Sequence, residues 1–62
     1  MLKVGDLVSS ELFGEEIIFC IMDFKTGNDG NCVAVLKGIY NSTLVVDAPL
    51  KSLKNIIITR KL

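Results

Sequence analysis

The chain alternates short apolar runs, rich in β-branched residues, with Gly, Asn, Asp and Pro along its whole length. The pattern begins over residues 3–8 and is still present over residues 45–50. No stretch repeats apolar residues at helical spacing for three turns. Short apolar runs separated by turn-forming residues are typical of small all-β domains. We therefore expect one small sheet that is strongly bent and closed on itself.

The length and composition limit the chain to one domain, which we place at residues 1–62. Half of the residues are apolar, which is enough for a packed core. The seven acidic and seven basic side chains cancel, so the molecule as a whole has no general attraction to nucleic acid or anionic lipid. The longest apolar run, residues 17–22, is too short to span a membrane. With no secretory leader and only two cysteines, a cytoplasmic location is expected.

The charges are unevenly distributed along the sequence. Residues 1–31 carry six acidic and two basic side chains, whereas residues 32–62 carry five basic and one acidic. The second half could therefore form a basic patch around Lys51, Lys54, Arg60 and Lys61. The alternative is an ordinary solvated edge that keeps the domain soluble.

Turn residues divide the chain into five expected strands, at residues 4–8, 16–25, 31–37, 43–47 and 55–59. A loop is expected over residues 9–14. A hairpin turn is expected over residues 26–30, where Asp29 and Gly30 would supply positive-φ positions. Before the last strand, Pro49 fits the first position of a helical turn, and Leu50 and Leu53 could both face inward across one 3₁₀ turn. This order predicts a five-stranded SH3-like barrel, of the KOW or Tudor kind, with a 3₁₀ turn before its last strand.

Centring the long hairpin on Asn28 places Cys32 opposite Phe24 and Leu36 opposite Cys20. The two cysteines would then not be neighbours, and we expect free thiols because a disulfide needs Cα atoms within about 7 Å. The second and third strands are apolar on both faces. If one face lines the core, the other face needs cover, and an exposed remainder would mark a contact with a protein partner, a missing domain or a second copy. If the inward set is Ile18, Cys20, Met22, Ala34 and Leu36, a second set then needs cover too, some of which the bend of the barrel can supply: Ile17, Phe19, Ile21, Val33 and Val35.

The sequence shows no set of residues that could carry out catalysis. It contains no histidine, and both cysteines lie in apolar strands, where a thiol pKa is raised rather than lowered. Glu15 and Glu16 are adjacent, so on a strand they point to opposite faces and cannot share a substrate. The oxygen-rich turn at residues 28–31 lacks the ligand spacing of a calcium loop. We therefore expect neither an enzyme nor a metal or cofactor site in this chain.

A few exposed residues could take part in binding. Phe19 and Phe24 are expected in the core, which leaves Phe13 and Tyr40, both in expected loops, as contact residues. A nucleic-acid interface would need stacking aromatic residues and a basic groove. The candidate set is Phe13, Tyr40, Lys37, Lys51, Lys54 and Arg60. Binding of nucleic acid is the alternative to a protein contact and is less favoured by the scattered lysines.

Four segments, taken in order, resemble the N-terminal region of the YabG family, which are sporulation-specific peptidases of spore-forming Firmicutes. The basic residues that the family tends to carry at Ser9 or Ser10, near Cys20 and near Thr43 are absent here, which argues against a shared basic surface. The matching segments are Val4-Gly5-Asp6-Leu7-Val8, Ile18-Phe19-Cys20-Ile21, Ala34-Val35-Leu36-Lys37-Gly38, and Leu44-Val45-Val46-Asp47-Ala48-Pro49-Leu50 with Leu53.

The resemblance covers almost the whole of this chain but only the beginning of such a peptidase. The peptidase machinery of the family lies downstream, so no catalytic residue is carried over. The resemblance implies a non-catalytic accessory domain that recruits a substrate or coat protein, or that packs against the catalytic domain. It also implies a place in the mother cell or the spore coat.

Overall fold

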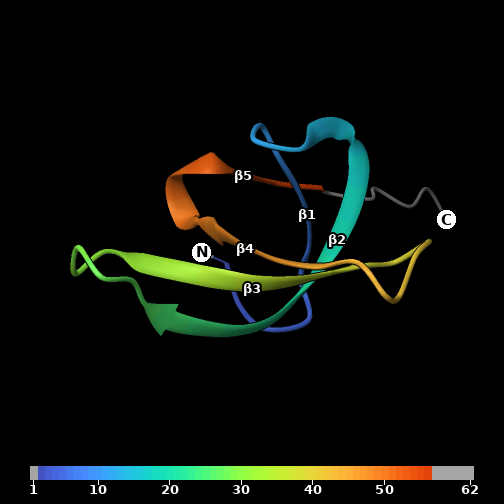
Figure 1. Ribbon diagram of the computed structural model, residues 1–62. Helices are drawn as coiled ribbons and strands as arrows, with labels where there is room; N and C mark the ends of the chain where they lie inside the picture. The colour runs from blue at the N-terminus through green and yellow to red at the C-terminus, as the bar shows by residue number, and fades with distance from the viewer. Residues whose placement is uncertain (1, 57–62) are drawn as a thin grey trace, which may run out of the picture.

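The structure is a computed structural model that describes residues 2–56 and contains one antiparallel sheet of five strands (Figure 1). The strands lie side by side in the order β4-β3-β2-β1-β5. A 3₁₀ turn, η1, precedes the last strand. The expected all-β, SH3-like barrel with this turn is therefore confirmed. The elements are β1 (Leu7–Ser10), β2 (Gly14–Thr26), β3 (Cys32–Gly38), β4 (Val45–Pro49), η1 (Leu50–Ser52) and β5 (Leu53–Asn55).

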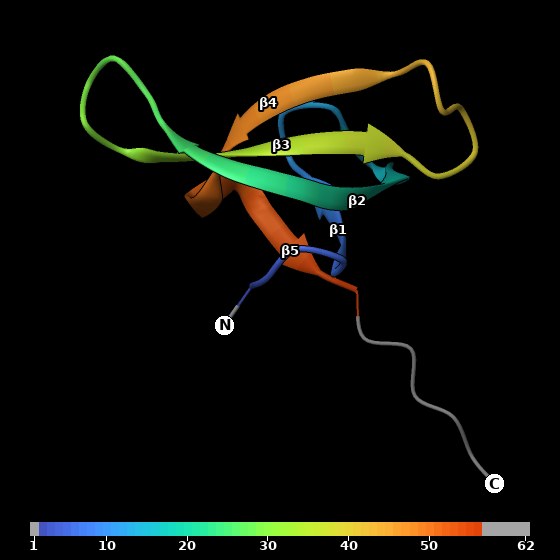
Figure 2. The ribbon, with the colours of Figure 1, turned by 90° about the horizontal axis from the view of Figure 1, so that it is seen from below.

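The long strand β2 bends the sheet into a barrel. Its first half pairs with β1 and its second half pairs with β3, so it belongs to both sides of the fold (Figure 2). A bulge at Met22, between Ile21 and Asp23, interrupts the pairing with β3. An extra residue in one strand bends that strand and increases its twist. The chain before β1 then closes over the bend, because the Gly5 amide donates to the Ile21 carbonyl at 2.8 Å.

The core lies inside this bend. Three residues are neighbours across adjacent strands: Phe24 on β2, Ala34 on β3 and Ala48 on β4. The two small alanine side chains leave room for the Phe24 ring beside them. Leu50 and Leu53 pack against the same cluster, which confirms that both face inward around η1. The fully buried apolar side chains are Val8, Phe19, Ile21, Ala34, Leu36 and Ala48.

Several expected strand limits are wrong. The first strand begins at Leu7, not at residue 4, because Gly5 adopts a φ of 95° and turns the chain. Asp6 holds this turn by accepting hydrogen bonds from the Lys3 amide and the Lys3 ammonium, and these bonds lower the pKa of Asp6. The last strand begins at Leu53, directly after η1. Residues 57–59, also expected in that strand, lie outside the described part of the chain.

The expected register of the long hairpin is also wrong. The structure places Thr26 opposite Cys32 and Phe24 opposite Ala34, a shift of two residues from a turn centred on Asn28. Beyond the bulge, Cys20 lies opposite Lys37. The two cysteines are indeed free, as predicted. Of the two turn residues expected at positive φ, only Gly30 adopts it.

The bulge also decides which β2 side chains face the core. Phe19 and Ile21 are fully buried, so the inward set assumed for this strand is wrong, whereas Ala34 and Leu36 of β3 face inward as expected. Met22, at the bulge, has 47% of its surface exposed. Ile18 and Cys20 are half-buried on the outer face.

Two buried serines join β1 to η1. The Ser10 and Ser52 hydroxyls lie 3.0 Å apart, and Ser52 Oγ donates to the Pro49 carbonyl at 2.8 Å. Because the Ser52 proton is used there, Ser10 must donate to Ser52, and Ser10 Oγ in turn accepts the Leu12 amide at 3.2 Å. Ser9 and Ser10 thus lie buried in a strand, where the sequence had suggested a loop. Such a chain of aligned donors strengthens each of its bonds.

Ser10→Ala is expected to lower the free energy of unfolding by about 1–3 kcal/mol, because it leaves buried polar partners without a hydrogen bond. Urea unfolding followed by circular dichroism measures the loss. Ser42→Ala, in an exposed turn, is the matched control and should change the free energy of unfolding by less than about 0.5 kcal/mol. Equal stability of the two variants would contradict the buried serine pair.

Candidate functional site

Two surface hollows lie at the two ends of β3. One lies beside the β2–β3 loop and the other beside the β3–β4 loop, and these loops point in opposite directions in Figure 1. With seven residues in β3 the hollows are separated by roughly 20 Å, given a rise of about 3.3 Å per residue. They are therefore independent surfaces.

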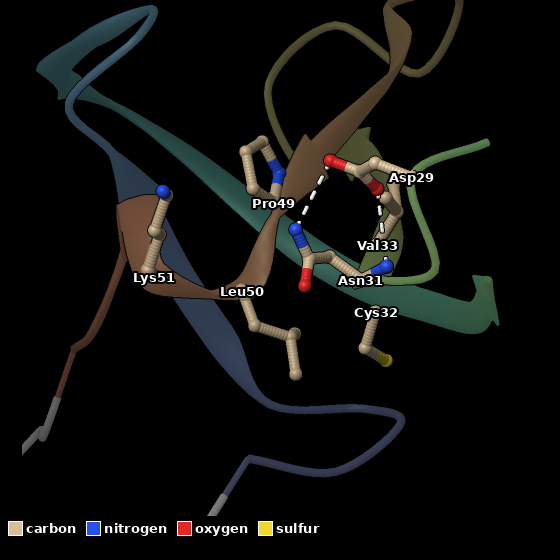
Figure 3. Close-up of a pocket in the computed structure, with 7 residues that line it drawn as sticks. All are labelled: Asp29, Asn31, Cys32, Val33, Pro49, Leu50 and Lys51. Atoms are coloured by element: carbon tan, nitrogen blue, oxygen red, sulfur yellow. Dashed lines mark hydrogen bonds between the residues drawn. The ribbon is translucent and has the colours of Figure 1, made fainter. Parts of the chain in front are cut away.

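The first hollow, of about 480 Å³, has apolar walls from Cys32, Val33, Pro49 and Leu50. Most of its polar rim is formed by Asp29 and Asn31 of the β2–β3 loop. Figure 3 shows Asp29 and Asn31 together on one side, with Lys51 on the other.

Both oxygens of the Asp29 carboxylate accept a hydrogen bond from within the turn. One of its oxygens accepts the Asn31 amide and the other accepts the Asn31 side-chain Nδ2, both at 3.0 Å. These two bonds, the backbone one foremost, lower the pKa of Asp29. The carboxylate therefore stabilises the turn and is poorly placed to bind a ligand.

The second hollow, of about 300 Å³, lies over Gly38 where β2 begins and the β3–β4 loop turns. The Ile39 amide donates to the Ile18 carbonyl at 3.1 Å, and the Gly38 amide donates to the Leu44 carbonyl at 2.9 Å. The lining residues are Glu16, Ile17, Ile18, Gly38, Tyr40, Asn41 and Leu44.

Two exposed apolar side chains, Ile17 and Tyr40, line this second hollow, and two more, Ile39 and Val45, directly follow lining residues in the sequence. We call these four residues the Tyr40 patch. Tyr40 is 85% exposed, Val45 55%, Ile39 41% and Ile17 38%. Burial of such side chains is worth about 25 cal/mol per Å² of apolar surface removed from water. Their exposure together at one end of the sheet leaves this free energy available to a partner.

The turn that presents the patch is tightly built. Asn41 Oδ1 accepts hydrogen bonds from the Thr43 amide at 3.2 Å and from Thr43 Oγ1 at 2.7 Å. The Leu44 amide donates to the Asn41 carbonyl at 3.0 Å. A Cβ at Gly38 would lie only 2.8 Å from that carbonyl oxygen, so glycine is needed for the close approach. These contacts leave Ile39 and Tyr40 at the outside of the turn.

The structure separates the aromatic candidates. Tyr40 is fully accessible beside the second hollow, as expected. Phe13 is only 37% exposed, because its ring packs edge-on against Phe19 with 5.8 Å between ring centroids. Phe13 thus contributes to the edge of the core as well as to the surface.

The basic candidates are dispersed as well. Lys37 is half-buried on β3 and Lys51 lies beside the first hollow, at the opposite end of β3 from Tyr40. Lys54 lies 3.7 Å from Glu15 in an exposed ion pair. Arg60 lies outside the described residues. Within residues 2–56, no basic groove with stacking aromatic residues is formed.

Sequence reasoning pointed to an exposed apolar surface but misplaced it. Of the β2 residues expected to need cover, Ile17 is exposed but Phe19 and Ile21 are buried, and the structure also exposes Met22 in β2 and Ile39 and Tyr40 in the β3–β4 turn. Ile39 was not singled out, although an Ile-Tyr pair in a turn is itself a signal. Turns normally carry polar residues or Gly and Pro, so a large apolar pair there indicates a surface used for contact.

In residues 2–56, no three His, Cys, Asp or Glu side chains lie close enough to hold a metal ion. Over the same range, every buried side-chain nitrogen or oxygen has a hydrogen-bond partner. The part of the chain that the structure describes has no helix long and apolar enough to cross a membrane.

No family model, curated protein or solved structure matched this chain.

Proposed function

We propose that this chain is a non-catalytic SH3-like accessory domain that contacts another protein or another domain through the Tyr40 patch. The observation that carries the proposal is the exposure of Ile17 and Tyr40 in the lining of one hollow, with exposed Ile39 and Val45 next to lining residues in the sequence. Clustered apolar residues on a small soluble domain mark an interaction surface. Tyrosine at the centre of such a surface is typical of residues that dominate binding energy.

The resemblance to the N-terminal region of YabG peptidases supports an accessory role, because the residues of the matching segments have structural roles in the barrel. Gly5 and Asp6 form the turn before β1, and Gly38 allows the tight β3–β4 turn. Ala48 is buried, and Pro49 leads into η1. The segments thus specify a scaffold, and two residues of the Tyr40 patch, Ile39 and Tyr40, lie in the turn between two of them. On this scaffold the patch would recruit a coat-protein substrate or dock the domain onto a catalytic domain.

The proposal is tested by adding unlabelled protein to the ¹⁵N-labelled chain and following its amide resonances. The additions are a purified YabG-type catalytic domain and, separately, a purified coat-protein substrate. With at least one of them, the amides of Ile17, Gly38, Tyr40 and Leu44 are expected to shift. Tyr40→Ser should weaken that binding roughly thirtyfold, which corresponds to about 2 kcal/mol at a binding hot spot.

The control for this titration is Lys51→Ser, at the other hollow, which should leave the affinity unchanged. Because Tyr40 and Lys51 are both exposed, neither change should disturb folding. No shift with either protein would refute the proposal. Shifts centred on Lys51 and Lys54 on addition of a short RNA or DNA at low salt would favour a nucleic-acid-binding module instead.

A further inference from the structure

The charge beside the second hollow indicates what kind of segment the hollow accepts. We infer that the Tyr40 patch binds a segment that presents an aliphatic side chain with Lys or Arg within one or two residues of it. The inference rests on the proposed function and adds the chemistry of the partner.

Glu16 is the charged residue among those lining the second hollow. It is exposed, and it forms no ion pair with any residue from 2 to 56. Its neighbour Glu15 differs, because Glu15 points to the other face of β2 and pairs with Lys54. Among residues 2–56, the hollow therefore has an apolar floor and, at its rim, one carboxylate without an ion-pair partner.

The basic residue nearest along β3 does not neutralise Glu16. Lys37 lies opposite Cys20 and Val45, and Cys20 is four residues from Glu16 along β2, where Glu16 has no partner in the β2–β3 ladder. Tyr40 and Asn41 supply the other polar groups of the lining, and neither carries a charge at neutral pH. A partner cation near Glu16 would complement the rim while an aliphatic side chain fills the floor.

The size of the hollow agrees with a single anchoring side chain. A volume of about 300 Å³ is at the small end of ligand pockets, which span about 300–1,000 Å³. A flanking cation at an exposed rim adds little affinity, about 0.2–1 kcal/mol, but it favours partners of the right charge. The apolar contact thus provides the binding energy, and Glu16 provides the selectivity.

Two ten-residue synthetic peptides with the same two leucines test the inference. One carries lysines beside the leucines and the other carries glutamates at the same positions. The lysine peptide is expected to shift the amides of Ile17, Gly38, Tyr40 and Leu44 of the ¹⁵N-labelled chain more strongly. The difference between the peptides should shrink at high salt, because exposed charges are then screened.

Glu16→Lys should weaken binding of the lysine peptide about two- to fivefold, the range given by an exposed ion pair. It should also remove the preference for the lysine peptide over the glutamate peptide. Glu11→Lys is the matched control, because it makes the same charge change in an exposed turn whose backbone bonds to Ser52, away from the second hollow. That control should keep the preference.

Equal shifts with the two peptides, no shift with either, or the same loss of preference in Glu11→Lys would overturn the inference. The proposed function fails on a different result, which is the absence of shifts with the peptidase domain and the coat protein. A partner protein could instead shift the amides of the Tyr40 patch equally in wild type and in Glu16→Lys. That result would support the proposed function but would contradict the inference that the bound segment is basic.

Discussion

Phe19→Ala is expected to remove most of the stability of this domain. Phe19 is fully buried at the centre of β2, where the strand pairs with β1 on one side and β3 on the other. Truncating a buried Phe to Ala costs about 3–5 kcal/mol, because apolar contacts are lost and a cavity remains. A domain of 62 residues has roughly 3–9 kcal/mol in total, at about 0.05–0.15 kcal/mol per residue. Circular dichroism during urea unfolding measures the loss.

Two further variants keep this prediction testable if Phe19→Ala does not fold. Phe19→Leu keeps an apolar side chain of smaller volume, so it should fold and unfold at a lower urea concentration than wild type. Phe13→Ala is the matched control, because its ring touches Phe19 but is 37% exposed. It should cost about 1–2 kcal/mol, which combines the edge-on ring contact with partial burial. A cost at Phe13 equal to that at Phe19 would contradict the position of the core.

The architecture was predictable because its signals are local. Short apolar runs between turn-forming residues indicate the strands, and Gly30 marks the hairpin turn. Pro49 before two spaced leucines specifies the 3₁₀ turn. Each signal depends on a few neighbouring residues, so it survives without knowledge of the fold.

The register was not predictable, because it depends on contacts between distant parts of the chain. The bulge at Met22 occurs where the Gly5 amide reaches the Ile21 carbonyl, and no property of Met22 itself indicates a bulge. A one-residue slip exchanges the two faces of a strand, so this single bulge decides that Phe19 and Ile21 face the core. Which β2 side chains face the core therefore follows from the folded structure and not from the local sequence.

The buried serines show a second limit of sequence reasoning. Ser10 and Ser52 are separated by 42 positions in the sequence, yet their hydroxyls meet in the interior. Serine favours turns and caps when it is considered by itself, so β1 was expected to end before Ser9. A polar side chain can be buried when a partner satisfies it, and that partner is visible only once the chain has folded.

The candidate site has one feature that local sequence indicates and another that depends on contacts between distant residues. The sequence indicated that Tyr40 would be exposed in a turn, and it is. The hollow beside Tyr40 was not predictable, because it forms where Ile17 of β2 and Leu44 before β4 lie on either side of Gly38. Lys51 and Tyr40, grouped as one candidate surface from composition, lie at opposite ends of β3.

Gly38→Ala is expected to distort the β3–β4 turn and to lower the free energy of unfolding by about 1–3 kcal/mol, the range for overpacking a tight site. The added Cβ would lie 2.8 Å from the Asn41 carbonyl oxygen, which is a backbone atom and cannot rotate away. Relief of this contact must move Asn41, and with it Tyr40 and the hollow. We therefore expect the variant to remain folded, to show shifted amides at Tyr40 and Leu44, and to bind the partner of the Tyr40 patch more weakly.

Gly27→Ala is the control for this glycine, because a Cβ there would meet the Val33 Cγ2 methyl at 3.2 Å. That methyl belongs to a side chain and can shift by a few tenths of an ångström. Gly27→Ala should therefore cost less than about 1 kcal/mol and leave the Tyr40 amide and partner binding unchanged. Urea unfolding and amide spectra of both variants decide the matter. If Gly38→Ala were as stable as Gly27→Ala and kept the wild-type Tyr40 resonance, the close approach at Asn41 could not be what holds the patch in place.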